Sequence, residues 1–373
     1  MKGVSFSFIK SKVNENNKHI LSLAKTFNTP NQPIKVYPRG SCSYRNIKYL
    51  NFSDLIEPDT NLYFYSPCIC EYTSEYYRLF YRVSTKTKWR NDKIATCLLT
   101  KELNVVVGTN KYLSLHSVAK ESEVKTSENV RNMLPKTYFT FKDGEHVEDP
   151  RAVIFNNAWF LLYTDGVHMG IAKLELDTCD TIYSHYLEKP ENSNHLESDG
   201  REKNWIPFVA EDKLYILYSD IPRTIVTCID SIDKLEYSDV NISDEITSWD
   251  YGAVRGGAPP CEYDKDTLIW FFHSQSTYPS YFRQNNVNVY MAGYYLTTNV
   301  FPYKVVAISK IPLIVGIPSN YVKDMFFADC VAFAMGCVKI SSGWRLSVHL
   351  NDCEIGILDV SESDFIWKKS LNN

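Results

Sequence analysis

Five segments of this chain repeat one layout, and this repetition limits the possible folds more than any other feature. Each segment has a polar or proline-containing corner, a short apolar strand, a turn, and a second aromatic strand that ends in a polar group. The segments are residues 65–82, 148–165, 203–220, 255–274 and 327–352. Repetition at a long, regular spacing is typical of folds built from arrays of one supersecondary unit.

The turns inside these segments contain residues that β-hairpins require. Asn156-Asn157, Glu211-Asp212 and Ser341-Ser342-Gly343 each separate two β-rich runs, and Asn, Asp and Gly tolerate left-handed backbone conformations. One repeat follows the previous one after about 68 residues, which leaves room for a second pair of strands and hence for a four-stranded propeller blade. Candidate outer strands are residues 137–141, 171–176, 224–229, 289–296 and 355–360.

These patterns predict an all-β fold with a single five-bladed β-propeller. We expect residues 61–373 to form the propeller, which would be the catalytic domain, and residues 1–60 to form an N-terminal extension that packs on it. Long helical periodicity is nearly absent, which argues against an α/β barrel.

The charge and cysteine patterns exclude several classes of function. Lys and Arg total 40 against 44 acidic residues, so no broad cationic field is available for nucleic acid or an anionic membrane surface. We find no apolar run long enough for a membrane span and no signal peptide. The ten cysteines lack a C-x-x-C pair or zinc-type spacing, so we expect reduced, structural thiols in a cytoplasmic protein. Homo-oligomerisation stays open.

Corresponding loops of all propeller blades meet at one end of the central channel. Polar residues at equivalent corners of the repeats should therefore come together, although they are far apart in sequence. These residues are Arg82, Glu148, Asp149, Arg151, Asp165, Lys203, Asn204, Asp220, Arg255, His273, Asn351 and Asp352. Carboxylates that move protons, amides that bind hydroxyls and cations that accept an anion are the groups that a sugar-processing pocket uses.

Four motifs in chain order resemble one enzyme family. They are Glu148-Asp149-Pro150-Arg151, the run from Lys203 to Phe208, Gly256-Gly257-Ala258-Pro259-Pro260 followed by a strand into His273, and Tyr290-Met291-Ala292-Gly293. Over about residues 60–360 the chain resembles glycoside hydrolase family 130, the five-bladed mannoside phosphorylases and β-mannosidases, and the related propeller mannosyltransferase/phosphorylases.

The resemblance implies an inverting enzyme that acts on mannosides, with Asp149 as the general acid. In that family the acid protonates the leaving oxygen through a neighbouring sugar hydroxyl. The resemblance also implies sugar contacts by Asn204 and Asp352. The phosphate or anion ligands that it implies are Arg82, Lys203, His273 and Tyr290.

The repeat corners suggest further contacts. Glu148, Arg151 and Asp220 are candidate substrate ligands, and Arg255 is an additional cation. The expected partner is an oligosaccharide or a sugar phosphate. No cofactor is expected, although inorganic phosphate or a sugar phosphate could be a co-substrate, and no metal site is assigned.

Departures from the family pattern leave the direction of the reaction open. Ser66 precedes Pro67, where the family often has Asn, and the segment Tyr218-Ser219-Asp220 replaces a family arginine that contacts phosphate. Phosphorolysis, hydrolysis and transfer from an activated sugar all stay possible. Hydrolysis would need a second carboxylate to activate water, and Asp220 or Glu202 are the candidates.

Two other classes of protein stay open. The first is a catalytically inactive propeller that binds a glycan or a protein, because a fold alone does not determine function. The second is a five-bladed furanosidase of the invertase or arabinanase kind. Such enzymes use an Asp nucleophile near the start of the chain, and residues 1–60 offer no convincing one.

Overall fold

The structure, a computed structural model, describes eleven stretches of the chain. They are residues 47–50, 62–85, 88–115, 146–166, 168–190, 202–220, 223–230, 235–243, 249–279, 286–316 and 330–368. Apart from one short 3-10 turn at Glu362–Asp364, the regular elements of these stretches are β-strands. None of the described residues belongs to a helix with the length and apolar character needed to cross a membrane.

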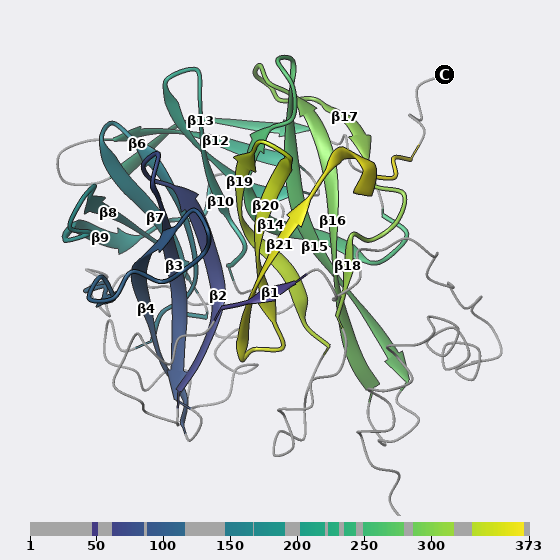
Figure 1. Cartoon of the computed structure of the whole chain (residues 1–373). Helices are drawn as coiled ribbons and strands as arrows, with labels where there is room; N and C mark the ends of the chain where they lie inside the picture. The colour runs from purple at the N-terminus through teal and green to yellow at the C-terminus, as the bar shows by residue number, and fades with distance from the viewer. Residues whose placement is uncertain are drawn as a thin grey trace, which may run out of the picture.

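The strands form five antiparallel sheets, which are the blades of a five-bladed β-propeller (Figure 1). Blade 1 contains β2 (Leu62–Glu71), β3 (Tyr76–Thr85), β4 (Lys88–Thr100) and β5 (Lys111–Tyr112), and blade 2 contains β6 (Glu148–Phe155), β7 (Ala158–Thr164), β8 (Met169–Glu175) and β9 (Thr181–Tyr186). Blade 3 contains β10 (Ile206–Ala210), β11 (Lys213–Asp220), β12 (Arg223–Asp230) and β13 (Leu235–Ser243). Blade 4 contains β14 (Ala253–Glu262), β15 (Thr267–Pro279), β16 (Asn286–Thr298), β17 (Val305–Ile308) and the short β18 (Ile314–Val315). Blade 5 contains β19 (Ala332–Ile340), β20 (Gly343–Leu350), β21 (Glu354–Val360) and β1 (Lys48–Tyr49).

The first strand of each repeat is the innermost strand of its blade. The five inner strands β2, β6, β10, β14 and β19 contact one another in a closed ring. The predicted five-bladed all-β fold is therefore confirmed. The predicted hairpin turns are also confirmed, since both residues of Asn156-Asn157 and of Glu211-Asp212 have positive φ angles.

The ring is closed by a strand from the predicted extension. Lys48 and Tyr49 of β1 pair with Ile357 and Gly356 of β21, so the outer strand of the last blade comes from the beginning of the chain. Figure 1 shows this strand, in purple, beside the yellow strands of blade 5. The boundary predicted at residue 60 therefore cuts through blade 5, while residues 1–46 and 51–60, like the candidate strand 137–141, lie outside the described residues.

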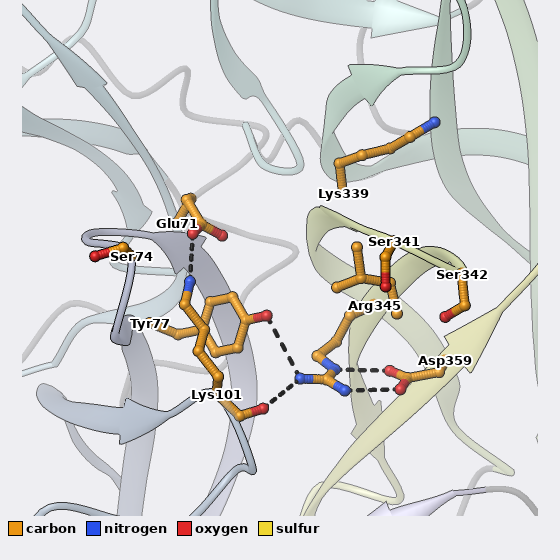
Figure 2. A pocket seen from close by; sticks show the side chains of 10 residues that line it. Glu71, Ser74, Tyr77, Lys101, Lys339, Ser341, Ser342, Arg345 and Asp359 are labelled. Atoms are coloured by element: carbon orange, nitrogen blue, oxygen red, sulfur yellow. Dashed lines mark hydrogen bonds and ion pairs between the residues drawn. The ribbon is translucent and has the colours of Figure 1, made fainter.

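Arg345 joins blade 5 to blade 1 across the seam of the ring. Its guanidinium forms two hydrogen bonds of 2.7 Å with the carboxylate of Asp359 in its own blade. A third nitrogen donates to the backbone oxygen of Lys101 in blade 1 at 2.9 Å, and the same nitrogen reaches the Tyr77 hydroxyl (Figure 2). The planar guanidinium suits this bridge because it donates in several fixed directions at once.

Aromatic side chains fill the spaces between blades. Trp159 of blade 2 packs edge-on against Phe80 of blade 1, and Trp270 of blade 4 packs edge-on against Phe208 of blade 3. The nine described cysteines are free thiols, and seven of them are buried. They act there as small hydrophobic residues, as the sequence suggested.

Bulges interrupt the inner hairpins near the same end of the propeller. The strand register shifts between Tyr65 and Cys68, between Glu148 and Arg151, and between Arg255 and Ala258. Two residues inside these bulges, Ser66 and Asp149, have left-handed backbones with φ angles of 50° and 58°. A left-handed backbone costs a residue other than glycine roughly 1–2 kcal/mol, so the surrounding structure must hold both residues in place.

The pair Gly256-Gly257 allows blade 4 to approach its neighbours closely. A Cβ atom on Gly257 would lie 2.2 Å from the backbone oxygen of Phe271, and one on Gly256 would lie 2.0 Å from the backbone oxygen of Asn204. No side-chain movement can relieve a clash with backbone. Gly256 therefore serves the contact with blade 3, and Gly257 serves the packing against the next strand of blade 4 and, at 3.0 Å, the Ala334 backbone oxygen of blade 5, with no need for a ligand.

We expect Gly257→Ala to lower the free energy of unfolding by about 2–3 kcal/mol, because overpacking beside backbone atoms cannot relax. Urea denaturation would measure the loss. The matched control is Gly108→Ala, since a Cβ there meets nothing within 4 Å and the change costs only about 1 kcal/mol for its left-handed backbone. Equal losses in the two variants would contradict the close-approach argument.

Candidate active site

Asp149, the predicted general acid, lies in the bulge at the start of β6. Its Oδ1 atom accepts a hydrogen bond of 2.7 Å from the Ser66 hydroxyl of blade 1. The Arg82 guanidinium lies 3.5 Å from the same oxygen, and the Asp149 side chain is 17% exposed. The carboxyl group is thus held on one side by protein and stays open on the other.

The charges around Asp149 determine its protonation. Burial raises the pKa of this carboxyl group, but the cations Arg82 and Arg151, together with His349 and the Ser66 hydrogen bond, outweigh burial and lower the pKa to about 2. Asp149 is therefore ionised at neutral pH in the ligand-free protein. A general acid must carry a proton, so the site needs a way to supply one.

Arg82 is surrounded by carboxylates, in a group that we call the acid cluster: Arg82, Asp92, His146, Glu148 and Asp149. Arg82 Nε donates to Asp92 at 2.7 Å, Nη2 also pairs with Asp92, and Nη1 pairs with Glu148 and Asp149. His146 Nε2 lies 2.9 Å from Glu148 Oε1. An anion could reach Arg82, a predicted phosphate ligand, only by displacing carboxylates, so this geometry assigns Arg82 to the acid side of the site.

Arg151 was predicted to bind substrate, but its side chain is fully buried. Its Nε donates to the Gly257 backbone oxygen at 2.7 Å. Its two terminal nitrogens donate to the backbone oxygens of Asp149 and Gly256 and to the side-chain oxygen of Asn204. A side chain enclosed in this way cannot contact a ligand, so the prediction is corrected: Arg151 connects blades 2, 3 and 4 beneath the site.

A second group is centred on His273, and we call it the cation cluster: Lys203, Arg255 and His273. Arg255 pairs with His273 across the hairpin of blade 4. Burial lowers the pKa of His273 well below its usual value, the charges of Arg255, Arg151 and Lys203 lower it further, and Asp149 acts in the opposite direction. The imidazole is therefore neutral. Because Asp149, Lys203 and Arg255 each shift the pKa of His273, these predicted residues of blades 2, 3 and 4 lie within electrostatic reach of the imidazole.

Stacked rings connect the two clusters. The His273 ring lies 4.6 Å from that of Phe333, and the Phe333 ring lies 4.5 Å from that of His349 on its other side. Tyr290, a predicted anion ligand, lies beside this stack at 6.2 Å from His273. Both faces of Phe333 are thus covered, and the stack joins the two clusters through buried rings.

Asp352, a predicted sugar contact, lies at the acid side of the site. Its Oδ1 atom is 2.7 Å from His349 Nε2, and 48% of its side chain is exposed. Asn204, the other predicted sugar contact, is buried with its oxygen turned toward Arg151. Its φ angle of 66° gives it the same left-handed corner as Ser66 and Asp149.

Asp220 is corrected as a substrate ligand. It is 2% exposed and accepts a hydrogen bond of 2.9 Å from the Tyr295 hydroxyl, at the boundary between blades 3 and 4. A carboxylate sealed in this way cannot activate water. Glu202, the other candidate base, accepts hydrogen bonds from Tyr218 and Trp205.

Sequence reasoning missed several members of the site, namely Asp92, His146, Phe333 and His349. The hairpin register could have indicated His349, because the pairs Tyr65–Arg82, Arg255–His273 and Phe333–His349 occupy similar places in their blades. Asp92 belongs to β4, a third strand, where the repeat comparison had no corner to examine. Its contact with Arg82 depends on tertiary packing.

The buried neutral state of His273 predicts a pH effect on stability. Because the pKa is lowered in the folded state only, the unfolded chain takes up a proton below about pH 6.5 and the folded chain does not. The free energy of unfolding should therefore fall as the pH drops below 6.5, by up to about 1.4 kcal/mol per pH unit. His273→Phe should flatten this slope between pH 6.5 and 5 in urea denaturation, and an unchanged slope would contradict a buried neutral imidazole.

The fold and the site together define a five-bladed β-propeller in which stacked rings connect an acid cluster and a cation cluster. Among solved structures, the chain is similar to a glycosyl hydrolase from Bacteroides ovatus, with a TM-score of 0.54 and 13% identity, over 92% of this chain and 99% of that one. A putative glycoside hydrolase from Parabacteroides distasonis matches with a TM-score of 0.52 and 16% identity, over 87% and 96% of the two chains.

A third structure, described with the GH130 family of mannoside phosphorylases and its hydrolases of β-1,2 mannosidic linkages in Candida mannan, has a TM-score of 0.52 and 13% identity over 92% and 99% of the chains. The expected resemblance in fold is thus confirmed. No protein-family model matches the chain, and no curated protein is significantly similar to it in sequence.

Proposed function

We propose that this protein is an inverting, mannoside-active enzyme in which Asp149 protonates the leaving oxygen and an anion is the nucleophile. The observation that carries the proposal is the placement of Asp149 beside Arg82 and Arg151, cations from two blades, and within electrostatic reach of the neutral His273, on which Lys203 and Arg255 also act. The choice of a mannoside rests on the fold shared with a member of the GH130 family.

The two clusters suit an anionic nucleophile better than water. Lys203 and Arg255 supply positive charge, and a neutral imidazole can bind a phosphate oxygen or a sugar hydroxyl. The two carboxylates considered for water activation, Asp220 and Glu202, are both held by aromatic donors. We therefore favour phosphorolysis, or its reverse, in which a mannosyl phosphate extends an acceptor sugar.

A bound anion would also prepare the acid. The pKa of Asp149 is low because Arg82 and Arg151 favour its ionised form. A phosphate nearby would offset these charges and raise that pKa, since like charges disfavour each other. The acid would thus gain its proton only when the nucleophile is in place, and a proton would be available at the step that needs it.

A direct assay tests the proposal. The purified protein would be incubated with β-mannobiose, mannose 1-phosphate or nucleotide-linked mannose, with and without inorganic phosphate, and the sugars would be separated by chromatography. We expect phosphate-dependent consumption of β-mannobiose with release of mannose 1-phosphate of inverted configuration. Absence of turnover with all three substrates would overturn the proposal.

One observation favours a second candidate, a propeller that binds a glycan without turnover. In the ligand-free protein Asp149 carries no proton at neutral pH and Arg82 is already paired with carboxylates. A propeller that only binds a glycan would need neither a proton on Asp149 nor an unpaired Arg82. The two candidates differ in whether a bound sugar is converted, so the same assay combined with a binding measurement separates them.

A further inference from the structure

A line of hydrogen bonds leads from Asp149 through Ser66 to one ring nitrogen of His349, and from the other ring nitrogen to Asp352. Asp149 Oδ1 accepts from the Ser66 hydroxyl at 2.7 Å, and Ser66 Oγ lies 2.9 Å from His349 Nδ1. His349 Nε2 lies 2.7 Å from Asp352 Oδ1. The four residues come from blades 1, 2 and 5, so the fold alone brings them together.

The middle of this line is sealed and its outer end is open. Ser66 is fully buried, and the His349 side chain is 3% exposed. The imidazole lies between the ring of Phe333 at 4.5 Å and that of Tyr65 at 5.3 Å, so it cannot swing away. Asp352, by contrast, is about half exposed. The line therefore joins Asp149, through a sealed interior, to the partly exposed Asp352 carboxylate.

The hydrogen-bond chemistry fixes the direction of the line. An ionised carboxylate only accepts hydrogen bonds, so the single hydroxyl proton of Ser66 points to Asp149. Ser66 must then accept from His349, which places a proton on Nδ1. His349 Nε2 lies 2.7 Å from the Asp352 carboxylate and 3.2 Å from the Asp352 backbone N–H. It accepts from the backbone N–H when the imidazole is neutral and donates to the carboxylate once it carries a proton.

We propose that His349 holds the proton that Asp149 delivers, and that Ser66 passes it between them. This inference rests on the function proposed above. The Nδ1–H bond of the imidazolium breaks as its proton moves to Ser66 Oγ, and the Ser66 O–H bond breaks as its proton moves to Asp149 Oδ1. A neutral imidazole and a protonated Asp149 result. Asp149 then gives the proton to the leaving oxygen, and a proton from water restores the imidazolium.

The surrounding charges determine when the proton moves. Arg82 and Arg151 act on Asp149, and Glu148 pairs with the same nitrogen of Arg82. Asp352 and Tyr65 face His349, and His273 lies beyond Phe333. Arg82 and Arg151 keep the pKa of Asp149 low in the empty site, so Asp149 is ionised there and accepts from Ser66. The negative charge of the bound nucleophile raises the pKa of Asp149, and negative charge that develops on the leaving oxygen draws the proton onward, so transfer to Asp149 becomes favourable.

Two variants test the relay. His349→Asn keeps an N–H group close to the position of Nδ1 but has no titratable group, and Ser66→Ala breaks the line at its centre. We expect each to lower kcat by about 10-fold or more. In His349→Asn the alkaline limb of the pH profile should move at least about one pH unit lower, because the acid must then be protonated directly. The control His185→Asn, on the outer strand β9, should leave activity and pH profile unchanged.

A second measurement needs no turnover. Carbon-13 NMR of the Asp149 carboxyl group, assigned with Asp149→Asn, would follow its titration in the ligand-free protein. In the wild type the signal should respond both to its own protonation and to that of His349, and the second response should disappear in His349→Asn and Ser66→Ala. Identical titration curves, or an unshifted pH profile, would overturn the relay. Wild-type protein without turnover would overturn the proposed function, and the NMR titration would then decide on the proton coupling by itself.

Discussion

Asp149→Asn should reduce kcat by about 10²–10⁴-fold, the range typical for the loss of a general acid. The amide is nearly isosteric with the carboxyl group, keeps an oxygen for the Ser66 hydroxyl and cannot supply a proton. Binding of mannose 1-phosphate, measured by calorimetry, should persist. It should become tighter, because the variant removes a negative charge that partly neutralises Arg82 and Arg151.

Asp180→Asn is a matched control for this change. Asp180 is exposed and pairs with Lys111 at the surface, so the variant should change neither turnover nor binding. Turnover of Asp149→Asn within a few-fold of the wild type would contradict a role for Asp149 as the acid. Unchanged sugar binding in both variants, with no turnover in the wild type either, would identify a binding propeller.

Arg151→Met should lower the free energy of unfolding by about 3 kcal/mol or more. The buried guanidinium donates to the oxygens of Asp149, Asn204, Gly256 and Gly257, and each buried acceptor that loses its donor costs about 1–3 kcal/mol. Methionine fills similar volume but donates nothing. Urea denaturation would measure the loss, and we expect the thermal midpoint to fall with it.

Arg255→Met separates stability from ligand binding. Arg255 is only partly buried and donates to the side chain of Gln275, so its loss should change stability by less than about 1 kcal/mol. It should instead weaken binding of phosphate or mannose 1-phosphate, because a cation of the cation cluster is removed. A large stability loss in Arg255→Met, or none in Arg151→Met, would contradict the roles assigned to the two arginines.

The fold could be predicted because its signals are local. Turn residues such as Asn156-Asn157 and Glu211-Asp212 determine hairpins within a few positions, and the repeat spacing sets the number of blades. Because corresponding corners of the blades meet at one end of the central channel, the approach of Asp149, His273 and Asp352 could be predicted as well. These features need no knowledge of individual side-chain contacts.

Individual side-chain contacts were harder to predict from the sequence, because they depend on strand register and on packing between blades. Arg151 and Asp220 occupy repeat corners as Asp149 and His273 do, but a bulge moves a side chain by one place and turns it to the other face of the strand. Arg151 is thereby directed between blades. The partners of Arg82 include Asp92 from a third strand, which no comparison of repeats would have selected.

The pairing of β1 with β21 has a consequence for the order of folding. Blades 1 to 4 are each made from consecutive strands and can assemble while the chain is being synthesised. Blade 5 needs Lys48–Tyr49 to wait until Glu354–Val360 has left the ribosome. Ser66 and Asp149 meet His349 and Asp352 only once the strands of blade 5 have been synthesised, so a chain that ends before blade 5 would lack this line of hydrogen bonds even with four blades in place.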